Sequence, residues 1–423
     1  MARQRPSGSP RLLLLGALAG LGACSSPVGP WSSPVAPGAK QARPVTVADP
    51  MPTQPGTNVP IEHVERLASF HRALRRTRAG GGDAVTRVVH MGDSSIGLDD
   101  FPHRLRRRFQ ERFGDAGPGF VLLQPHNPGY RNRTVRVRAS PPWPGLCFII
   151  RRCRRDGFYG LGGATVEAWG GARTRIAPAS GRRVSTAELW YAAQPRGGRV
   201  AFRFGKADVE ISTAGADLAD RWHRLRQPPG RHTAEVRALG GGRSRAFGVV
   251  LENGGPGVVW DTLSMTGAFT PRLLAHDEEH FARQLAHRDP DLVVLGYGGN
   301  DLRRLVGGAV TPEGFRSETL RVLQRIRSAV PRSSCLVVAI NDHLASGRLP
   351  VEPRHVQTLV DAQRTAAARA GCAFWDTTAA MGGTGTFRAW QRRGLAGGDG
   401  KHLSSRGREV LAARLFAAML AAR

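Results

Sequence analysis

The chain has 423 residues, 41% of them hydrophobic, so it can bury a sizeable core, and its length suits about two domains. Its formal charge is +28, yet only three of its 61 basic residues are lysines, and the arginines are scattered along the whole length. A nucleic-acid-binding protein would concentrate its basic residues in one recognition module, so the composition disfavours that class. A generally cationic surface still favours anionic surroundings, such as a membrane or cell-wall polymers.

The N-terminus carries the features of an export signal over residues 1–24. Arginines precede an apolar stretch over residues 12–23, which is too short to cross a bilayer but suits a signal peptide. The stretch ends in Leu21-Gly22-Ala23-Cys24, which resembles the lipobox of bacterial lipoproteins, where the cysteine is lipidated. An ordinary signal peptide with a chance cysteine is the alternative. We expect lipidation at Cys24, which would anchor the chain stably on a membrane. With Ser25 next, the resemblance implies an outer membrane and a protein facing the periplasm.

Residues 25–60 are rich in proline, serine, glycine and alanine and lack apolar periodicity, which predicts a tether without a fold. Order is expected from Ile61, beginning with a helical stretch to about Arg78. A strand over Val85–His90 then leads into Gly92-Asp93-Ser94, and a helix over Asp100–Phe113 follows. These elements over residues 61–130 predict the first part of an α/β domain.

The pattern changes over residues 131–257. Short strand-like alternations are separated by turns rich in glycine, proline and arginine, and no convincing amphipathic helix lies between them. This texture indicates an antiparallel β-sandwich of the jelly-roll kind. The predicted strands are Thr134–Arg138, Glu188–Tyr191, Arg199–Phe204, Val209–Ser212, Thr233–Ala238 and Phe247–Glu252.

Strands and helices alternate again over residues 258–423, and the strands are almost purely apolar. Continuous apolar strands favour a parallel sheet covered on both faces. The predicted strands are Val258–Leu263, Asp291–Tyr297, Leu336–Ile340 and Cys372–Trp375. Helices are expected to begin at Thr270 and Thr311, to span 356–370, and to close the chain from Ser405. The predicted fold is a three-layer α/β/α parallel sheet interrupted after its first strand–helix unit by an antiparallel sandwich.

Four cysteines remain if Cys24 is lipidated. An exported chain meets an oxidising compartment, so pairing is allowed. Cys147 and Cys153 are close enough in sequence to close a small loop, whereas Cys335 and Cys372 each begin a predicted strand, where a buried thiol is the commoner case. No spacing of cysteine and histidine indicates zinc, and no motif for a phosphate loop or a dinucleotide is present, so no metal or cofactor is expected.

Polar residues collect in the loops where functional groups of open parallel sheets are found, after the carboxyl ends of the strands. They are Ser94 in the first loop, Gly267 in the second, Asn300 in the third, and Asp399 with His402 before the last helix. This ordered set resembles the four blocks of the SGNH (GDSL-type) hydrolases. The position of the insert, the stretch 113–120 and the re-entry over 248–264 resemble the peptidoglycan O-acetylesterases of that superfamily that carry a jelly-roll.

The chemistry of these residues agrees with the roles that the resemblance implies. A serine hydroxyl needs an imidazole to take its proton, so Ser94 is the candidate nucleophile and His402 the base. Asp399, three residues earlier, can hold the other ring nitrogen of His402. The backbone N–H groups of Ser94 and Gly267 and the side-chain amide of Asn300 would stabilise an oxyanion. No Gly-x-Ser-x-Gly elbow is present, which disfavours the α/β-hydrolase fold.

Each of these residues also has a structural interpretation. Asp399 and His402 fit a surface turn, and Asn300 fits a helix start. His90 fits a buried core histidine better than a second base. His343, on the functional rim, could contact substrate but fits a loop histidine better. We expect Asp93 to fix the turn. Four tryptophans in the sandwich fit either sugar-stacking platforms or, for most of them, core positions: Trp143, Trp169, Trp190 and Trp222.

The sequence therefore predicts a lipid-anchored serine esterase that removes small acyl groups, O-acetyl above all, from cell-wall glycan such as peptidoglycan. An esterase or lipase on another exported acyl ester is one alternative. A catalytically silent, glycan-binding wall protein is another. Such a role would not require all five of the site residues, which are Ser94, Gly267, Asn300, Asp399 and His402.

Overall fold

The computed structural model describes residues 58–81, 84–127, 130–179 and 181–421, and a parallel sheet forms its central element. The signal peptide with Cys24, and all but the last three residues of the predicted tether, lie outside these ranges. The strands of the parallel sheet lie in the order β13-β1-β14-β15-β18. They span Val85–Gly92 (β1), Gly257–Ser264 (β13), Leu292–Gly296 (β14), Ser334–Val338 (β15) and Ala373–Trp375 (β18).

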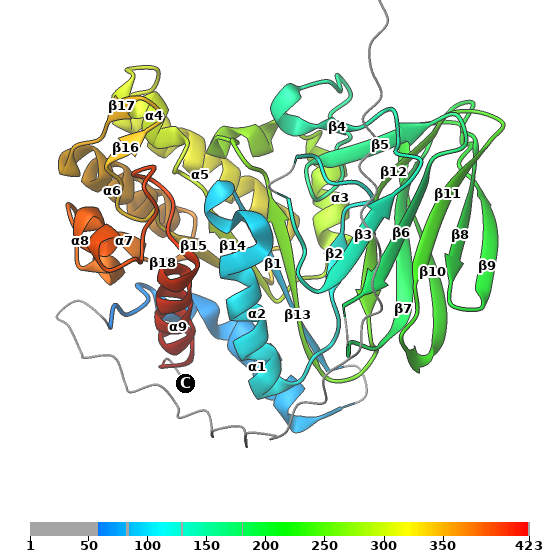
Figure 1. Cartoon of the computed structure of the whole chain (residues 1–423), viewed down its shortest axis with the longest axis horizontal. Helices are drawn as coiled ribbons and strands as arrows, with labels where there is room; N and C mark the ends of the chain where they lie inside the picture. Colours follow the sequence, from blue (N-terminus) through cyan, green and yellow to red (C-terminus); the bar gives the residue numbers. More distant parts are fainter. Residues whose placement is uncertain (1–57, 82–83, 128–129, 180, 422–423) are drawn as a thin grey trace, which may run out of the picture. The chain divides into compact units, whose positions relative to one another are not determined.

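Helices cover both faces of this sheet (Figure 1). One face packs on α1 (Ala68–Ala79), α2 (Asp100–Phe113) and α9 (Ser405–Ala421), with α7 (Thr377–Met381) and α8 (Phe387–Arg392). The other packs on α3 (Glu278–Arg288), α5 (Pro312–Ala329) and α6 (Pro353–Arg369), with α4 (Asp301–Val306). Within β1, Val88 belongs to the first core and Val89 to the second, because neighbouring side chains point to opposite faces. The predicted α/β fold with a parallel sheet is confirmed.

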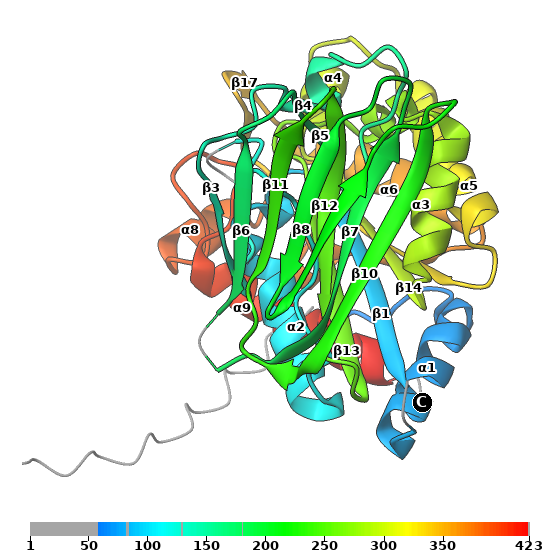
Figure 2. The ribbon, with the colours of Figure 1, turned by 90° about the vertical axis from the view of Figure 1, so that its right-hand side faces the viewer.

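Two antiparallel sheets lie between α2 and β13 in the sequence (Figure 2). One has the order β3-β6-β11-β8-β9; the other has the order β10-β7-β12-β5-β4, with β2 paired to β12. Apolar side chains from both sheets form a common core, Phe202 from the first sheet and Leu189 from the second among them. The strands are β2 (Gly119–Val121), β3 (Val135–Ala139), β4 (Cys147–Phe148), β5 (Ala164–Ala168), β6 (Arg173–Pro178), β7 (Val184–Ala193), β8 (Arg199–Phe204), β9 (Ala207–Ser212), β10 (Ala219–Gly230), β11 (Ala234–Gly240) and β12 (Ser244–Glu252).

The sheet that contains β7 and β12 also shares a core with the parallel sheet. Trp190 on β7 and Phe247 on β12 pack in the same apolar cluster as Phe281 on α3. Strand β2 belongs to this sheet although it precedes residue 131, where the sequence pattern placed the start of the insert. The antiparallel sheets are therefore joined to the parallel sheet by buried side chains as well as by the chain itself.

The structure differs from the predicted elements in one broken helix, in several short segments, and in the strands β2, β5, β6 and β10, which were not predicted. The predicted helix from Thr270 is broken: a 3-10 helix η4 ends at Ala275, and α3 begins after Asp277, whose carboxylate accepts from the His280 N–H at 2.8 Å. Such a cap starts a new helix. Other short elements are η1 (Val64–Leu67), η2 (Ser94–Asp99), η3 (Ile149–Arg151), β16 (Ala345–Ser346) and β17 (Leu349–Pro350).

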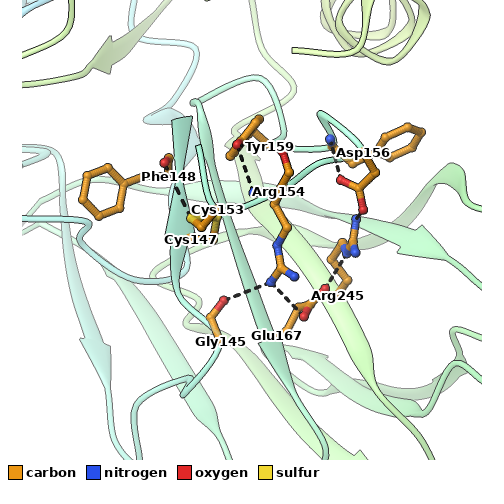
Figure 3. The surroundings of a disulfide bond; sticks show 10 residues. Gly145, Cys147, Phe148, Cys153, Arg154, Asp156, Tyr159, Glu167 and Arg245 are labelled. Atoms are coloured by element: carbon orange, nitrogen blue, oxygen red, sulfur yellow. Dashed lines mark hydrogen bonds and ion pairs between the residues drawn. A yellow bond between two sulfur atoms is a disulfide. The ribbon is translucent and has the colours of Figure 1, made fainter. Parts of the chain in front are cut away.

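All four cysteines of the described region are paired. Cys147 and Cys153 form one disulfide. Close to it, the Glu167 carboxylate forms ion pairs with Arg154 and Arg245 (Figure 3). Cys335 and Cys372 form the other, so the expectation of two buried thiols is wrong. The reason is the register of the parallel sheet: Leu336 and Ala373 are partners on β15 and β18, which places the preceding cysteines side by side.

Candidate active site

Ser94 directly follows the β1 strand at the carboxyl edge of the parallel sheet. Gly92 allows β1 to approach β14 closely there, since a side-chain carbon at this position would lie 2.7 Å from the Gly296 carbonyl oxygen. The Asp93 carboxylate, which is 1% exposed, accepts from the Ser95 N–H at 2.8 Å and from the Gly299 N–H at 3.1 Å. As expected, Asp93 fixes the turn, and it also ties the turn to the loop after β14.

A chain of hydrogen bonds joins Ser94 to His402 and Asp399. Ser94 Oγ lies 2.8 Å from His402 Nε2, and His402 Nδ1 lies 2.5 Å from Asp399 Oδ2. A carboxylate accepts only, so Nδ1 carries the hydrogen when the ring is neutral, which leaves Nε2 free to accept the Ser94 proton. The other Asp399 oxygen accepts from the N–H groups of Lys401 and His402 at 3.0 and 2.9 Å, which shapes the loop before α9.

The charge of Asp399 is stabilised by these same contacts. Burial alone would raise the pKa of the Asp399 carboxyl, but the hydrogen bonds from His402 and Lys401 outweigh it and lower the pKa to about 2. The carboxylate is therefore ionised throughout the range in which an imidazole titrates. An ionised carboxylate at Nδ1 favours a positively charged imidazole, the form that His402 takes after accepting a proton.

Gly267 and Asn300 lie in the two neighbouring loops. Gly267 has a φ of +88°, which favours glycine. Apart from its two chain neighbours, no described residue has an atom within 4 Å of where a side chain at Gly267 would begin. Asn300 Nδ2 donates to the Ala268 carbonyl at 3.0 Å, so the amide contacts the residue after Gly267. The buried Asp301 carboxylate accepts from both the N–H and the hydroxyl of Thr270 at 2.8 Å, which holds the two loops together.

A cavity of about 50 Å³ adjoins Ser94 and His402. Its lining includes Lys401, His343 and Tyr297 as well as Ser94, but neither Gly267 nor Asn300, so it adjoins one of the three proposed oxyanion donors. His343 is 3% exposed and its Nδ1 lies 2.7 Å from the Asn341 carbonyl, which makes Nδ1 the protonated nitrogen. Burial lowers the pKa of His343 to about 4. Its Nε2 has no hydrogen-bond partner among the described residues.

The sequence reasoning undervalued His343 and missed the contact of Lys401. His343 follows β15, the next strand of the sheet after β14. The rule that functional groups gather at carboxyl ends placed it on the rim, but a loop histidine was preferred. Lys401 lies between the predicted residues Asp399 and His402, and its side chain donates to Asn300 Oδ1 at 2.8 Å. Lysine occurs only three times in this chain, so a lysine beside the predicted base could have been singled out from the sequence.

The remaining candidates lie away from this site. His90 is buried, accepts from Trp260 Nε1 at 3.4 Å, and has its pKa lowered to about 3 by burial, which fits a core histidine. Of the tryptophans, Trp143 and Trp190 are buried and Trp222 stacks on His287, whereas Trp169 is 70% exposed. Within the described residues, no cluster of histidine, cysteine and carboxylate side chains could bind a metal ion. No helix in the same ranges is long and apolar enough to span a membrane.

Comparison with known proteins shows which proteins this chain is similar to. The sequence model of the GDSL-like lipase/acylhydrolase family matches residues 212–410, which include Gly267, Asn300, Asp399 and His402. A structure of a peptidoglycan O-acetylesterase superposes with a TM-score of 0.69 at 22% identity, covering 84% of this chain and 96% of that chain. Over residues 212–410 the chain therefore resembles the SGNH (GDSL-like) hydrolases. It is a carboxylic-ester hydrolase whose fold resembles that of the O-acetylesterase.

Other solved structures are less similar. A lipase/acylhydrolase from Enterococcus faecalis has a TM-score of 0.30 at 21% identity, covering 38% of this chain and 74% of that one. A family two carbohydrate esterase from Cellvibrio japonicus has a TM-score of 0.27 at 10% identity, covering 67% and 96%. We base no inference on these two. No curated protein sequence matches the chain.

Proposed function

We propose that this hydrolase is a serine esterase that removes small acyl groups, O-acetyl above all, from a cell-wall glycan such as peptidoglycan. The hydrogen-bonded chain from Ser94 through His402 to Asp399 carries the proposal, with distances of 2.8 and 2.5 Å. A hydroxyl that already faces an imidazole acceptor, with a carboxylate behind the ring, is arranged for nucleophilic attack on an ester.

In the proposed acylation, Ser94 Oγ attacks the ester carbonyl carbon while His402 Nε2 takes the hydroxyl proton. The tetrahedral intermediate then collapses, the bond to the sugar oxygen breaks, and His402 returns its proton to that oxygen, releasing the glycan hydroxyl. Asp399 holds the ring and stabilises its positive charge in between. The product of this half-reaction is an acyl ester on Ser94.

In the proposed deacylation, water attacks the acyl-enzyme with His402 again as the base, and the acid leaves with Ser94 restored. Both tetrahedral intermediates carry an oxyanion. The N–H groups of Ser94 and Gly267 and the Asn300 amide are the donors that we assign to it, each typically worth ~2.7–4 kcal/mol. The open surroundings of the Gly267 backbone leave space for the substrate there.

Two observations bear on the alcohol half of the ester. The fold resembles that of a peptidoglycan O-acetylesterase, which supports a glycan as the alcohol. The positive charge of the chain suits an anionic polymer.

The organisation predicted from the sequence completes the proposal. We propose that residues 1–24 are a lipoprotein signal peptide with Cys24 as the lipidated residue, and that 25–60 is a tether to a bacterial membrane, with the esterase facing the periplasm. Residues 61–130 and 258–423 would form the catalytic domain, and 131–257 an inserted jelly-roll-like sandwich. The two antiparallel sheets and their common core support the last assignment.

Acetate release from purified O-acetylated peptidoglycan tests the proposal directly. We expect the wild-type protein to release acetate and the Ser94→Ala protein to release none above background. Lipid esters with long acyl chains and other acetylated glycans serve as parallel substrates. Faster hydrolysis of the lipid esters would support a lipase instead, and a folded protein without activity on any ester would support a glycan-binding role.

A further inference from the structure

Lys401 makes a contact that the esterase mechanism above does not use. Its Nζ donates to Asn300 Oδ1 at 2.8 Å, while Asn300 Nδ2 donates to the Ala268 carbonyl at 3.0 Å. The side-chain amide is thus held at both ends. One end contacts the residue that precedes His402, and the other contacts the residue that follows Gly267.

These two contacts determine which way the Asn300 amide points. An ammonium group has donors and no acceptor, and a backbone carbonyl accepts only. The reverse orientation would place Nδ2 against the Lys401 ammonium and Oδ1 against the Ala268 oxygen, so both contacts would become repulsive. Ala268 uses one of the two Nδ2 hydrogens, which leaves the second for a substrate oxygen. The Lys401 charge at Oδ1 also polarises the amide and makes that hydrogen a better donor.

The backbone around Asn300 is fixed without Lys401. The preceding Gly299 N–H donates to Asp93, and the following Asp301 carboxylate holds Thr270. Removing the Lys401 amine would therefore leave the loop in place and free only the amide to rotate. Lysine is well suited to this task, because its compact ammonium can donate to the single oxygen of the Asn300 amide. The planar guanidinium of an arginine is better matched to a group with two acceptor oxygens.

We propose that Lys401 is a positioning residue that orients and polarises the Asn300 amide as an oxyanion donor. This inference rests on the proposed esterase function. Lys401 and His402 are adjacent in one loop. Lys401 holds the Asn300 amide, and His402 takes the proton from Ser94, so this loop contributes both to the oxyanion site and to proton transfer. Lys401 itself is not assigned a contact with the reacting atoms.

A double-mutant cycle on p-nitrophenyl acetate hydrolysis tests this role. The variants are Lys401→Met, Asn300→Ala and the double variant, with thermal melting to show that each is folded. Lys206→Met is the matched control, since it removes the same charge from the exposed hairpin between β8 and β9. We expect Lys401→Met to lower kcat about 10-fold with KM within about threefold, because a misplaced donor loses part of what a missing donor costs.

The double variant gives the decisive comparison. Once the Asn300 amide is absent there is nothing left to orient, so adding Lys401→Met to Asn300→Ala should change kcat by less than about twofold. The inference is overturned if Lys401→Met alone stays within twofold of wild type, or if it lowers kcat equally in both backgrounds. A wild-type protein without esterase activity would contradict the proposed function, and the inference with it.

Discussion

Two regions of the molecule hold buried polar groups, and they differ in how these groups are paired. At the junction of the parallel sheet with the antiparallel sheets, carboxylates meet arginines: Asp99 pairs with the fully buried Arg106 at 2.9 Å, and Asp261 with Arg288 at 2.6 Å. At the rim beside Ser94, the buried atoms His343 Nε2 and Tyr297 OH have no hydrogen-bond partner among the described residues.

The difference separates groups that hold the scaffold from groups that are available to a substrate. Buried charges are costly unless they are paired, so the junction pairs serve to fix α2, β13 and α3 in one arrangement. Unpaired polar atoms beside a nucleophile cost stability, and a ligand can compensate for them. Changes at the rim should therefore affect turnover, and changes at the junction should affect stability.

The largest expected effect is the loss of activity in Ser94→Ala. Removing the nucleophile of a serine hydrolase costs about 10⁴-fold or more in kcat, and thermal melting should stay unchanged because His402 is the hydroxyl's one hydrogen-bond partner among the described residues. Ester hydrolysis and melting are measured on the same preparations. Ser95→Ala, at the adjacent serine, is the control and should lose far less. Turnover by Ser94→Ala near the wild-type rate would contradict the assignment.

The next effect concerns the junction. Arg106→Met leaves the buried Asp99 carboxylate without its guanidinium partner, and we expect a loss of about 3–5 kcal/mol in the free energy of unfolding. Chemical denaturation measures it. Arg107→Met is the control on the same helix: its partner Glu111 is exposed, so the cost should stay below about 1 kcal/mol. Equal costs for the two variants would show that the buried pair does not hold the junction.

The third effect concerns the rim, where Asn300→Ala removes a proposed oxyanion donor. Loss of one oxyanion donor should lower kcat by about 10²–10³-fold with little change in KM, since the contact strengthens in the transition state. Steady-state kinetics on p-nitrophenyl acetate provide the measurement. Asn253→Ala, at a junction asparagine that donates to the Asp115 carbonyl, should leave kcat unchanged. A change confined to KM would mean that Asn300 binds the ground state only.

The smallest expected effect is the acid sensitivity of the junction. Burial alone would raise the pKa of Glu252, but Arg288 and Arg87 outweigh it and lower the pKa to about 2, from an ordinary 4.5. A lowered pKa stabilises the folded state above pH 4.5, here by about 3 kcal/mol, and this contribution is lost as the pH falls through about 2.

Unfolding free energies of wild type and Glu252→Gln, measured from pH 7 to pH 3, test this expectation. The difference between the two proteins should shrink as the pH falls. Glu111→Gln, at an exposed carboxyl, is the control and should show no such trend. A difference that stays constant across this range would contradict the pairing of Glu252 with the arginines.

Much of the α/β fold was readable from the sequence, because strands buried on both faces are continuous apolar runs. The antiparallel strand β10 was missed, since its arginines, glutamine and prolines hide any alternation, and it lies at the edge of its sheet, where prolines are tolerated. The disulfide between Cys335 and Cys372 could not be predicted from the sequence either. It depends on β15 and β18 being neighbours, which only the topology decides.

The candidate site shows the same limit. Ser94, His402 and Asp399 were predicted from the order of motifs, and in the structure His402 lies within hydrogen-bond distance of both of the others. The hydrogen bond from Lys401 to Asn300 was not predicted, because it joins loops that are about a hundred residues apart in sequence. Family recognition by sequence also stops short of Ser94, since the match begins at residue 212, beyond most of the antiparallel strands.

Covalent labelling with a serine-directed phosphonate tests the central claim, that Ser94 is the nucleophile, most directly. Intact-mass spectrometry and peptide mapping should find one phosphonyl group on Ser94 in the wild-type protein, none in Ser94→Ala, and slow labelling in His402→Ala, because the activating base is absent. A folded wild-type protein that stays unlabelled, or that carries the group on another residue, would contradict the account.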